Sequence, residues 1–397
     1  MIEIKRILPI IIRLTKNKLR EFNNRLLSDN TYKHNVFHKS YTKKALLYYL
    51  PNAFNRKGIP KFHANLTESY TIGEAFDQLG YIVDCITAGS SKKINYEQYD
   101  VILATGMPIH EILRQKKRPK LIFYAPGAHP FYSLDATAKK NLSVYEQKGV
   151  WLTKSSRYID PNAMGVYLSL FTDHVIILGN EWSLKQYTKW DSQRPSHYSA
   201  LKAFYFDCHQ PNFDNKDYKT SCSHILWFGS MGLIHKGLDI ALDIAIKHPE
   251  ITLHICGAPK REKDFWNYYS PLIKDCKNIV DHGFVNIESD QFVEIMNQCS
   301  FLIMPSISEG CSTSILNVVA NGGLIPIYSS ICGVDLQPIG ISIPSITYDA
   351  FEAAVLDAIR IQPDEIKKQS IQICELVRNN YTLEQYRNNL KEIISKI

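Results

Sequence analysis

The sequence lacks the features that mark several large classes of protein. It has no long low-complexity tract, and its nine cysteines, at positions 85, 208, 222, 256, 276, 299, 311, 332 and 374, stand singly, without a C-x-x-C motif or a histidine-rich neighbour at metal-ligand spacing. An odd number of scattered cysteines argues against a disulfide framework and against a zinc site. We therefore expect reduced thiols in a cytoplasmic protein, many of them in buried strands.

Basic runs interleaved with aromatic residues are also missing, although the formal net charge is +7, from 46 basic and 39 acidic residues. Proteins that bind single-stranded nucleic acid need such runs, so no nucleic-acid partner is expected. Much of the basic excess lies in the first sixty positions. The positive charge is therefore a local property of the N-terminus.

Residues 1–44 form this basic N-terminal segment, which has no apolar stretch long enough to span a bilayer. Its apolar run is interrupted by Pro9, and no small-residue cleavage site follows, so neither a transmembrane helix nor a cleaved signal is expected. Two interpretations stay open: a basic amphipathic segment on the anionic inner face of a membrane, and an N-terminal helix packed on its own domain. The expected location is cytoplasmic, and under the first interpretation peripheral to the membrane.

What the sequence does contain is a repeated alternation of short apolar strands and helical patterns. Its length of 397 residues suits two domains of common size. Strands are predicted at 45–50, 81–86, 100–104, 120–124 and 174–178, with a helix over 67–79. Elements in this order form βαβ units around a parallel sheet. Residues 45–211 are therefore predicted to form an N-terminal α/β domain.

A polar stretch at 212–221 is predicted to be a linker, after which the pattern restarts. Strands are expected at 224–228, 251–255, 278–280, 301–304 and 324–327, which makes residues 222–380 a second doubly wound domain. The tail at 381–397 is expected to be a helix that packs back toward the N-terminal domain. Two such domains bind ligands at the carboxyl ends of their strands, so functional residues are expected in the loops that follow strands.

The first such loop, FGSMGLIHKGLD, has the composition of an anion site. Gly229 and Gly232 allow close approach of the backbone, Lys236 supplies a positive charge, and a helix is expected to begin near Gly237 with its positive end toward the same place. The loop matches neither the Walker A motif nor G-x-G-x-x-G. A diphosphate would suit it, and a glycine turn with a solvated lysine is the alternative.

The second loop, PSISEG, places one carboxylate before a helix predicted at 313–321. The backbone N–H groups of Cys311, Ser312 and Thr313 would be unsatisfied first-turn donors, able to hold a phosphate or a sugar hydroxyl. Glu309 would then lie beside the sugar. In the alternative interpretation, Glu309 only complements the helix dipole.

The two loops together resemble those of a known family. In the first, a strand leads into a glycine loop that contains Lys-Gly; in the second, a strand leads into Pro-Ser-x-x-Glu-Gly and a helix that ends in Gly-Gly. They are similar to the nucleotide-sugar half of the retaining GT-B glycosyltransferases of group 1 or family 4, over roughly residues 222–335. The resemblance implies a GT-B fold of the α/β class, in which two doubly wound, Rossmann-like parallel-sheet domains face each other across a cleft. It also implies that the C-terminal domain binds a nucleotide-sugar donor and that the N-terminal domain, residues 45–211, binds the acceptor.

The resemblance implies roles for individual residues. Lys236 would bind the diphosphate, and Glu309 and Gly310 would lie at the donor sugar. The second glutamate of the family's E-x7-E motif, which binds the ribose, falls at Asn317, and the family's basic residue in the first loop is Ser230 here. These two departures predict altered nucleotide handling, with loss of activity as the alternative.

On the acceptor side, family members commonly carry a histidine in a loop after a strand. The loop YAPGAHP contains Gly127 and His129, and His129 is our third expected catalytic residue after Glu309 and Lys236. A surface histidine in a turn set by prolines is the alternative. His63 and Asn65, before another helix, would touch the acceptor or serve as helix caps.

The remaining features concern the nucleotide and its leaving group. The segment HGFV, with Phe284 and Val285, resembles the family segment whose backbone contacts the base. No D-x-D motif follows a strand, so no metal is expected, and the charge of the leaving diphosphate would fall to Lys236 and to helix N-termini. The donor is a substrate, and no cofactor is expected.

The sequence thus predicts a metal-independent, hexosyltransferase-like enzyme that moves a sugar from a nucleotide-sugar donor to a glycan or lipid-linked acceptor. Retention at the anomeric carbon and a place in the synthesis of surface polysaccharides or glycoconjugates are what the resemblance implies. Two alternatives stay open. A GT-B sugar-nucleotide epimerase should show additional acid/base residues at the donor. A catalytically inactive sugar-nucleotide-binding or scaffold protein would explain Ser230 and Asn317 together.

Overall fold

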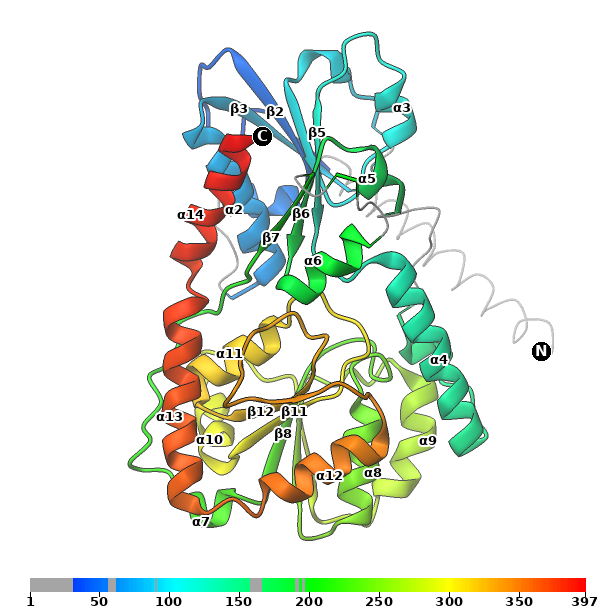
Figure 1. Ribbon diagram of the computed structural model, residues 1–397, viewed down its shortest axis with the longest axis vertical. Coiled ribbons are helices and arrows are strands. Elements are labelled where there is room, and N and C mark those ends of the chain that lie inside the picture. Colours follow the sequence, from blue (N-terminus) through cyan, green and yellow to red (C-terminus); the bar gives the residue numbers. More distant parts are fainter. Residues whose placement is uncertain are drawn as a thin grey trace, which may run out of the picture. The chain divides into compact units, whose positions relative to one another are not determined.

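The computed structural model describes residues 31–55, 62–88, 90, 92–157, 166–189, 193–194 and 197–397 (Figure 1). Most of the basic segment predicted at 1–44, and the membrane interpretation attached to it, lie outside the described residues. Within them, no helix combines the length and the apolar character that crossing a bilayer requires. The nine cysteines are all free thiols. The chain divides into two compact units, Met1–Ile122 and Phe123–Ile397.

The first sheet of the described chain contains seven strands in the order β1-β3-β2-β4-β5-β6-β7. Their bounds are β1 (Tyr32–Lys33), β2 (Lys43–Tyr49), β3 (Tyr81–Thr87), β4 (Val101–Ala104), β5 (Lys120–Ala125), β6 (His174–Leu178) and β7 (Tyr198–Leu201). Strand β2 runs parallel to β3 and β4, and β6 runs parallel to β7. The predicted parallel sheet is confirmed, with strands of continuous apolar residues such as β2 that suit burial on both faces.

Strand β1 departs from the prediction because it pairs with β3 in the antiparallel sense. Asp84, a buried carboxylate on β3, explains this edge. It accepts hydrogen bonds from the Tyr32 hydroxyl at 2.7 Å, the Tyr99 hydroxyl at 2.6 Å and the Asn35 backbone N–H at 2.8 Å. A two-residue strand has too little periodicity to be recognised in a sequence.

In the described part of the first unit, the helices are α2 (Ala64–Gln78) and α3 (Ile109–Leu113), with short 3-10 turns at Pro51–Phe54 and Tyr96–Gln98. Helix α2 begins at Ala64 rather than at the expected residue 67, because the Nδ1 atom of His63 accepts the Leu66 N–H at 3.4 Å and caps the helix.

The second sheet of the described residues has six strands in the order β10-β9-β8-β11-β12-β13. They are β8 (His224–Phe228), β9 (Thr252–Cys256), β10 (Ile279–Gly283), β11 (Phe301–Met304), β12 (Ile325–Ser329) and β13 (Ile341–Ile343), and their pairings are parallel. Helices α8 (Leu238–Lys247), α9 (Lys263–Ile273) and α12 (Tyr348–Ala358) lie on one side, and α10 (Asp290–Gln298), α11 (Thr313–Gly322) and α13 (Pro363–Asn380) on the other (Figure 1). This is the predicted doubly wound arrangement.

The other α-helices described in the second unit are α4 (Pro130–Lys148), α5 (Val166–Phe171), α6 (Glu181–Thr188), α7 (Tyr218–Ser221) and α14 (Leu383–Lys396). Helix α7 lies inside the expected linker, where Asp217 caps it through Lys219 and Thr220. Tyr386 of α14 contacts the hydroxyl of Tyr124 on β5 at 3.0 Å.

Helix α4 packs against the second sheet's helices. Val144 belongs to the same buried core as Ile225 and Ile303 of that sheet. Lys140 pairs with Asp239 at 2.6 Å and Lys148 with Asp243 at 2.5 Å, which fixes α4 along α8. Residues predicted in the N-terminal domain thus complete the core of the second sheet.

Candidate active site

Lys236 and Glu309 meet in a nearly buried ion pair at the carboxyl end of the second sheet. Lys236 lies in the loop after β8 and Glu309 in the loop after β11, and their side chains are 9% and 12% exposed. The Lys236 ammonium donates to Glu309 Oε1, and the Ser306 hydroxyl donates to the same oxygen at 2.9 Å. The structure therefore brings together the two residues that the sequence singled out.

The pair keeps Glu309 ionised. Burial alone would raise its pKa, but the charge of Lys236, followed by the charges of His235 and Arg157, outweighs burial and lowers the pKa of Glu309 to about 2. A carboxylate in a site with little water exerts a strong field on a developing positive charge. Glu309 is thus an anion at neutral pH, available to a cationic transition state.

His235 links the two loops. Its Nε2 contacts the Ser308 carbonyl at 2.7 Å, and its own carbonyl accepts the Ile307 N–H at 3.0 Å. Burial lowers the pKa of His235 to about 4, so the ring is neutral at neutral pH. Its Nδ1 is buried and has no hydrogen-bond partner among the described residues.

Gly310 sits where four backbone segments converge. A Cβ at this position would lie 2.3 Å from the Pro126 carbonyl oxygen and 2.9 Å from the Cα of Gly127. The Gly310 carbonyl accepts the Ser183 hydroxyl at 3.0 Å, and a Cβ on Gly333 would lie 1.7 Å from that carbonyl oxygen. Any larger residue would push these segments apart. Gly127, an expected acceptor residue, therefore lies against the Glu309 loop.

The N-terminus of α11 differs from the expected set of unsatisfied donors, because the Ser312 N–H donates to the Cys332 carbonyl at 2.9 Å. Ser312 is the N-cap, yet its side chain makes no capping hydrogen bond. Its hydroxyl is buried and has no partner among the described residues. The neighbouring Cys311 is buried and Thr313 is half-buried. A buried hydroxyl without a partner at the first turn of a helix suits a polar ligand.

Asn317, where the family places its second glutamate, has its amide engaged with the backbone. Its Oδ1 accepts the Phe206 N–H at 2.8 Å, and its Nδ2 donates to the Thr313 carbonyl at 2.8 Å. One turn later, Asn321 Oδ1 accepts the Cys208 N–H at 2.8 Å. An ionised glutamate could not donate to Thr313, so the structure explains the asparagine. Ribose binding by Asn317 stays a prediction.

The glycine loop after β8 is partly occupied by a carboxylate of the chain itself. Glu262, which is 8% exposed, accepts the N–H groups of Gly232 at 2.6 Å and Leu233 at 2.9 Å. These two donors are therefore not free for a phosphate. Gly229 contacts another loop instead, since a Cβ on Gly257 would lie 2.1 Å from the Gly229 carbonyl oxygen. Ser230 is exposed.

Arg157 is a functional candidate that the sequence analysis missed. One of its guanidinium nitrogens donates to the Met231 carbonyl at 2.7 Å, and a Cβ on Gly232 would lie 2.8 Å from its Nε. Its charge contributes to the low pKa values of Glu309 and His235. Arg157 follows the short 3-10 helix Thr153–Ser155 rather than a strand, so no motif in the sequence identifies it. Arg157 thus places a second positive charge, besides Lys236, beside the loop in which Ser230 replaces the family's basic residue.

The expected base-binding segment, residues 282–285, overlaps the end of β10. Gly283 adopts a positive φ of 67° and Phe284 is 86% exposed, whereas Val285 is buried. An aromatic ring this exposed at the carboxyl end of a strand is available for stacking on a base. Contact with the base stays a prediction for Phe284 and Val285.

The three expected acceptor-side residues other than Gly127 act as helix-end residues. His129 caps α4 by accepting the Phe131 N–H at 3.2 Å, is 2% exposed, and has its pKa lowered to about 4 by burial. It is neutral at neutral pH. His63 caps α2, and Asn65 lies in the exposed first turn of that helix. A catalytic role for His129 and acceptor contacts for His63 and Asn65 stay predictions.

Among the described residues, no group of three or more His, Cys, Asp or Glu side chains could hold a metal ion. No protein-family model matches the sequence. No curated protein matches it either.

Solved structures do match. Sucrose-phosphate synthase from Thermosynechococcus elongatus is 12% identical, with a TM-score of 0.59 over 89% of this chain and 98% of that one. HepE from Anabaena in complex with UDP is 12% identical, with a TM-score of 0.59, and the match covers 89% of this chain and 100% of HepE. TarM is 12% identical with a TM-score of 0.51, and the match covers 75% of this chain but only about half, 55%, of TarM. With the two α/β sheets, these similarities show that the chain has the GT-B fold of glycosyltransferases.

Proposed function

We propose that the protein is a glycosyltransferase that moves a sugar from a nucleotide-sugar donor to a glycan or lipid-linked acceptor, in the synthesis of a surface polysaccharide or glycoconjugate. The observation that carries the proposal is the buried Lys236–Glu309 pair beside the N-terminus of α11. The matches support it, since HepE was solved with UDP and glucose.

The site offers positive charge and hydrogen-bond donors to the diphosphate of the departing nucleotide. An ammonium has three donors, so Lys236 can keep one on Glu309 and offer the others to phosphate oxygens. The first-turn N–H groups of α11 and the exposed guanidinium of Arg157 add positive potential at the same place. These groups would stabilise the negative charge that develops on the leaving diphosphate.

The bonds change as follows. The bond between the anomeric carbon and the phosphate oxygen breaks, and its electron pair goes to the diphosphate. The acceptor hydroxyl oxygen forms the new bond to the anomeric carbon, and its proton passes to the departing phosphate oxygen. This order of events retains the anomeric configuration, because the acceptor arrives on the side that the diphosphate leaves. The Glu309 carboxylate would stabilise the positive charge on the sugar between the two events.

One observation favours a second candidate function, a sugar-nucleotide-binding protein without catalysis. Glu262 already binds the Gly232 and Leu233 N–H groups, and the Asn317 amide is already engaged. Both features remove groups that a nucleotide could otherwise use. Donor turnover separates the two functions, because only the transferase releases a nucleoside diphosphate.

The first test is thermal stabilisation of the full chain by UDP, GDP, ADP, CMP and dTDP sugars. A ligand that binds only the native state raises the unfolding temperature by mass action. We expect one nucleotide class to stabilise the protein, and Lys236→Ala to lose the effect. Lys367→Ala, which removes a lysine paired with the exposed Asp214, is the matched control and should keep it. A folded protein that no nucleotide stabilises would refute the proposal.

A further inference from the structure

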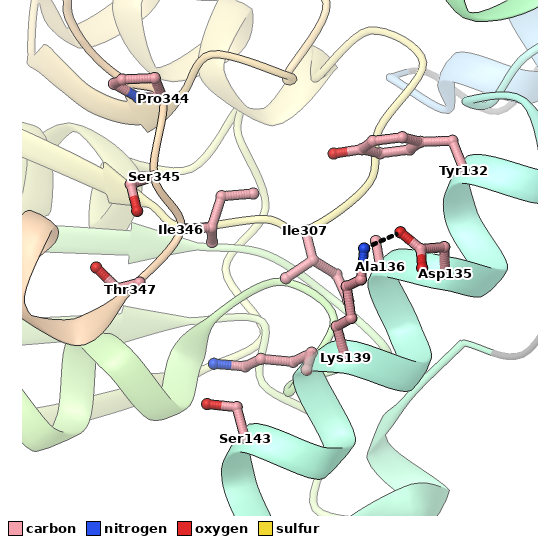
Figure 2. Close-up of a pocket in the computed structure, with 11 residues that line it drawn as sticks. Tyr132, Asp135, Ala136, Lys139, Ser143, Ile307, Pro344, Ser345, Ile346 and Thr347 are labelled. Atoms are coloured by element: carbon pink, nitrogen blue, oxygen red, sulfur yellow. Dashed lines mark hydrogen bonds and ion pairs between the residues drawn. The ribbon is translucent and has the colours of Figure 1, made fainter.

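A pocket of about 470 Å³ lies between α4 and the segment that joins β13 to α12 (Figure 2). Tyr132 and Ser143 on α4 line one wall, Ser345 and Thr347 the opposite wall, and Ile307 lies between them. Pockets of roughly 300–1,000 Å³ are typical of small-molecule sites. None of these residues was expected to be functional from the sequence.

The pocket is close to the candidate active site. Ile307 belongs to the loop that carries Glu309, and its N–H is held by the His235 carbonyl. Ser306, the preceding residue, donates to Glu309. The same short segment therefore forms a wall of the pocket and positions the carboxylate.

The charges at the pocket cancel. Lys139 pairs with Asp135 at 2.7 Å, as Figure 2 shows, and both residues line the pocket. Lys140, another lining residue, pairs with Asp239 at 2.6 Å, and both partners are nearly buried. Each ammonium is thus neutralised by a carboxylate. The exposed Lys139–Asp135 pair has no net charge, and Lys140 is held by Asp239, so these lining residues offer no unpaired cation to an anion and the pocket suits a neutral ligand.

The polar groups that remain are hydroxyls beside apolar surface. The side chains of Ser143 and Ser345 offer hydroxyls, and Tyr132 offers a phenol on an aromatic ring. The Thr347 hydroxyl caps α12 by accepting the Ala350 N–H at 3.3 Å and can still donate its own proton. Ile307 and the neighbouring Ile346 provide apolar contacts. A sugar ring has the complementary chemistry, with hydroxyls at its rim and C–H groups on its faces, which pack on aromatic and aliphatic side chains.

We propose that this pocket binds a neutral saccharide, the acceptor of the transfer reaction. That the saccharide is the acceptor rests on the proposed function. That the pocket binds a saccharide rests on the pocket alone. It assigns acceptor recognition to α4 and to the β13–α12 segment, rather than to His63 and Asn65.

The test fills the pocket from α4. Ala136 lines it, whereas Ala138 is exposed on the same helix and does not. The full chain, Ala136→Phe and the matched control Ala138→Phe are tested by ligand-observed NMR against neutral mono- and disaccharides of gluco, galacto, manno and N-acetyl types. We expect at least one saccharide to bind wild type and Ala138→Phe, and to bind Ala136→Phe at least about tenfold more weakly.

Ser345→Phe fills the pocket from the other wall and replaces Ala136→Phe if that variant does not fold. The inference is overturned if no saccharide binds wild type, if filling the pocket leaves binding unchanged, or if glucose 6-phosphate binds more tightly than glucose. Nucleotide-sugar stabilisation is measured on the same samples. Its absence would refute the proposed function, while saccharide binding still decides whether the pocket is a sugar site.

Discussion

Lys236 and Glu309 illustrate what single residues contribute. The sequence predicts both as functional, but it assigns one to the diphosphate and the other to the sugar. The structure shows that they also bind each other. Their contact depends on how β8 and β11 lie side by side in the sheet, which no spacing along the chain encodes.

The pair yields a prediction about stability. Lys236→Met leaves the Glu309 carboxylate buried without its cation, and breaking a buried pair in this way should lower the free energy of unfolding by about 3 kcal/mol. The Lys236→Met/Glu309→Gln double variant removes the stranded charge and should be more stable than Lys236→Met. Urea denaturation at neutral pH measures the free energy of unfolding of wild type, of Lys236→Met, of Glu309→Gln and of the double variant. Strictly additive effects of the two single changes would contradict the coupling.

Arg157 yields a prediction about affinity. If its guanidinium contacts the diphosphate, Arg157→Gln should weaken binding of the stabilising nucleoside diphosphate about tenfold, the size of one charge-assisted hydrogen bond. Adding Ser230→Arg to this variant should recover part of the loss, because it restores a cation near the same loop. Lys154→Gln, an exposed change in the same segment, is the control and should bind as wild type does. Titration calorimetry gives the affinities, and equal values for wild type and Arg157→Gln would exclude the role.

At the scale of elements, α11 shows where sequence reasoning reaches its limit. Its bounds are close to the predicted 313–321, because periodicity and the closing glycines are local signals. Helix α11 also binds the backbone of residues 206–209 through Asn317 and Asn321, and these hydrogen bonds are long-range in sequence. An asparagine on a helix gives no sign of its partner, so this contact could not be predicted.

This engagement makes the asparagine structural. Asn317→Glu places a carboxylate where a donor to Thr313 is needed, and should lower the free energy of unfolding by about 1–3 kcal/mol. Asn380, whose Nδ2 donates to the Leu376 carbonyl at 2.8 Å in an exposed turn of α13, provides the control. Asn380→Glu should change stability far less. Chemical denaturation compares the two, and a harmless Asn317→Glu that also tightens nucleotide binding would favour the family's ribose contact.

Three neighbouring strands carry a row of histidines. His254 on β9 lies 3.0 Å from His224 on β8 and 3.0 Å from His282 on β10, nitrogen to nitrogen. Burial, with the charges of His224 and His282, lowers the pKa of His254 to about 4. All three rings can then be neutral, each donating to the next. The row ties three strands together through side chains.

The row predicts a pH dependence of stability. Because the pKa of His254 is lower in the folded than in the unfolded state, the unfolded chain gains a proton first as pH falls from about 6.5 to about 4, and stability is lost over that window. Between about pH 7 and pH 5 the loss from His254 should be about 2 kcal/mol. His254→Gln should remove this part of the pH dependence, and His110→Gln, at an exposed site, should not. Urea denaturation at the two pH values measures it, and equal pH dependence in all three proteins would contradict the assignment.

At the scale of the molecule, the GT-B fold could be predicted from alternating strand and helix patterns and from two loops. The packing of α4 could not. Its buried face joins the core of the second sheet through Val144 and through the Lys140–Asp239 and Lys148–Asp243 pairs. An amphipathic pattern predicts a helix and its buried face but not the sheet that covers it. The pocket beside α4 escaped prediction for the same reason.

The proposed transfer reaction is tested most directly by the rate at which nucleoside diphosphate is released from the stabilising nucleotide sugar. Chromatography measures this rate for wild type and for Glu309→Gln. Water can replace the acceptor in this reaction, so no acceptor need be known. We predict slow release by wild type and at least about a hundredfold slower release by Glu309→Gln, because the electrostatic stabilisation of the sugar is lost. A wild-type protein that binds the donor but releases nucleoside diphosphate no faster than Glu309→Gln would contradict the proposed catalysis and leave a binding protein.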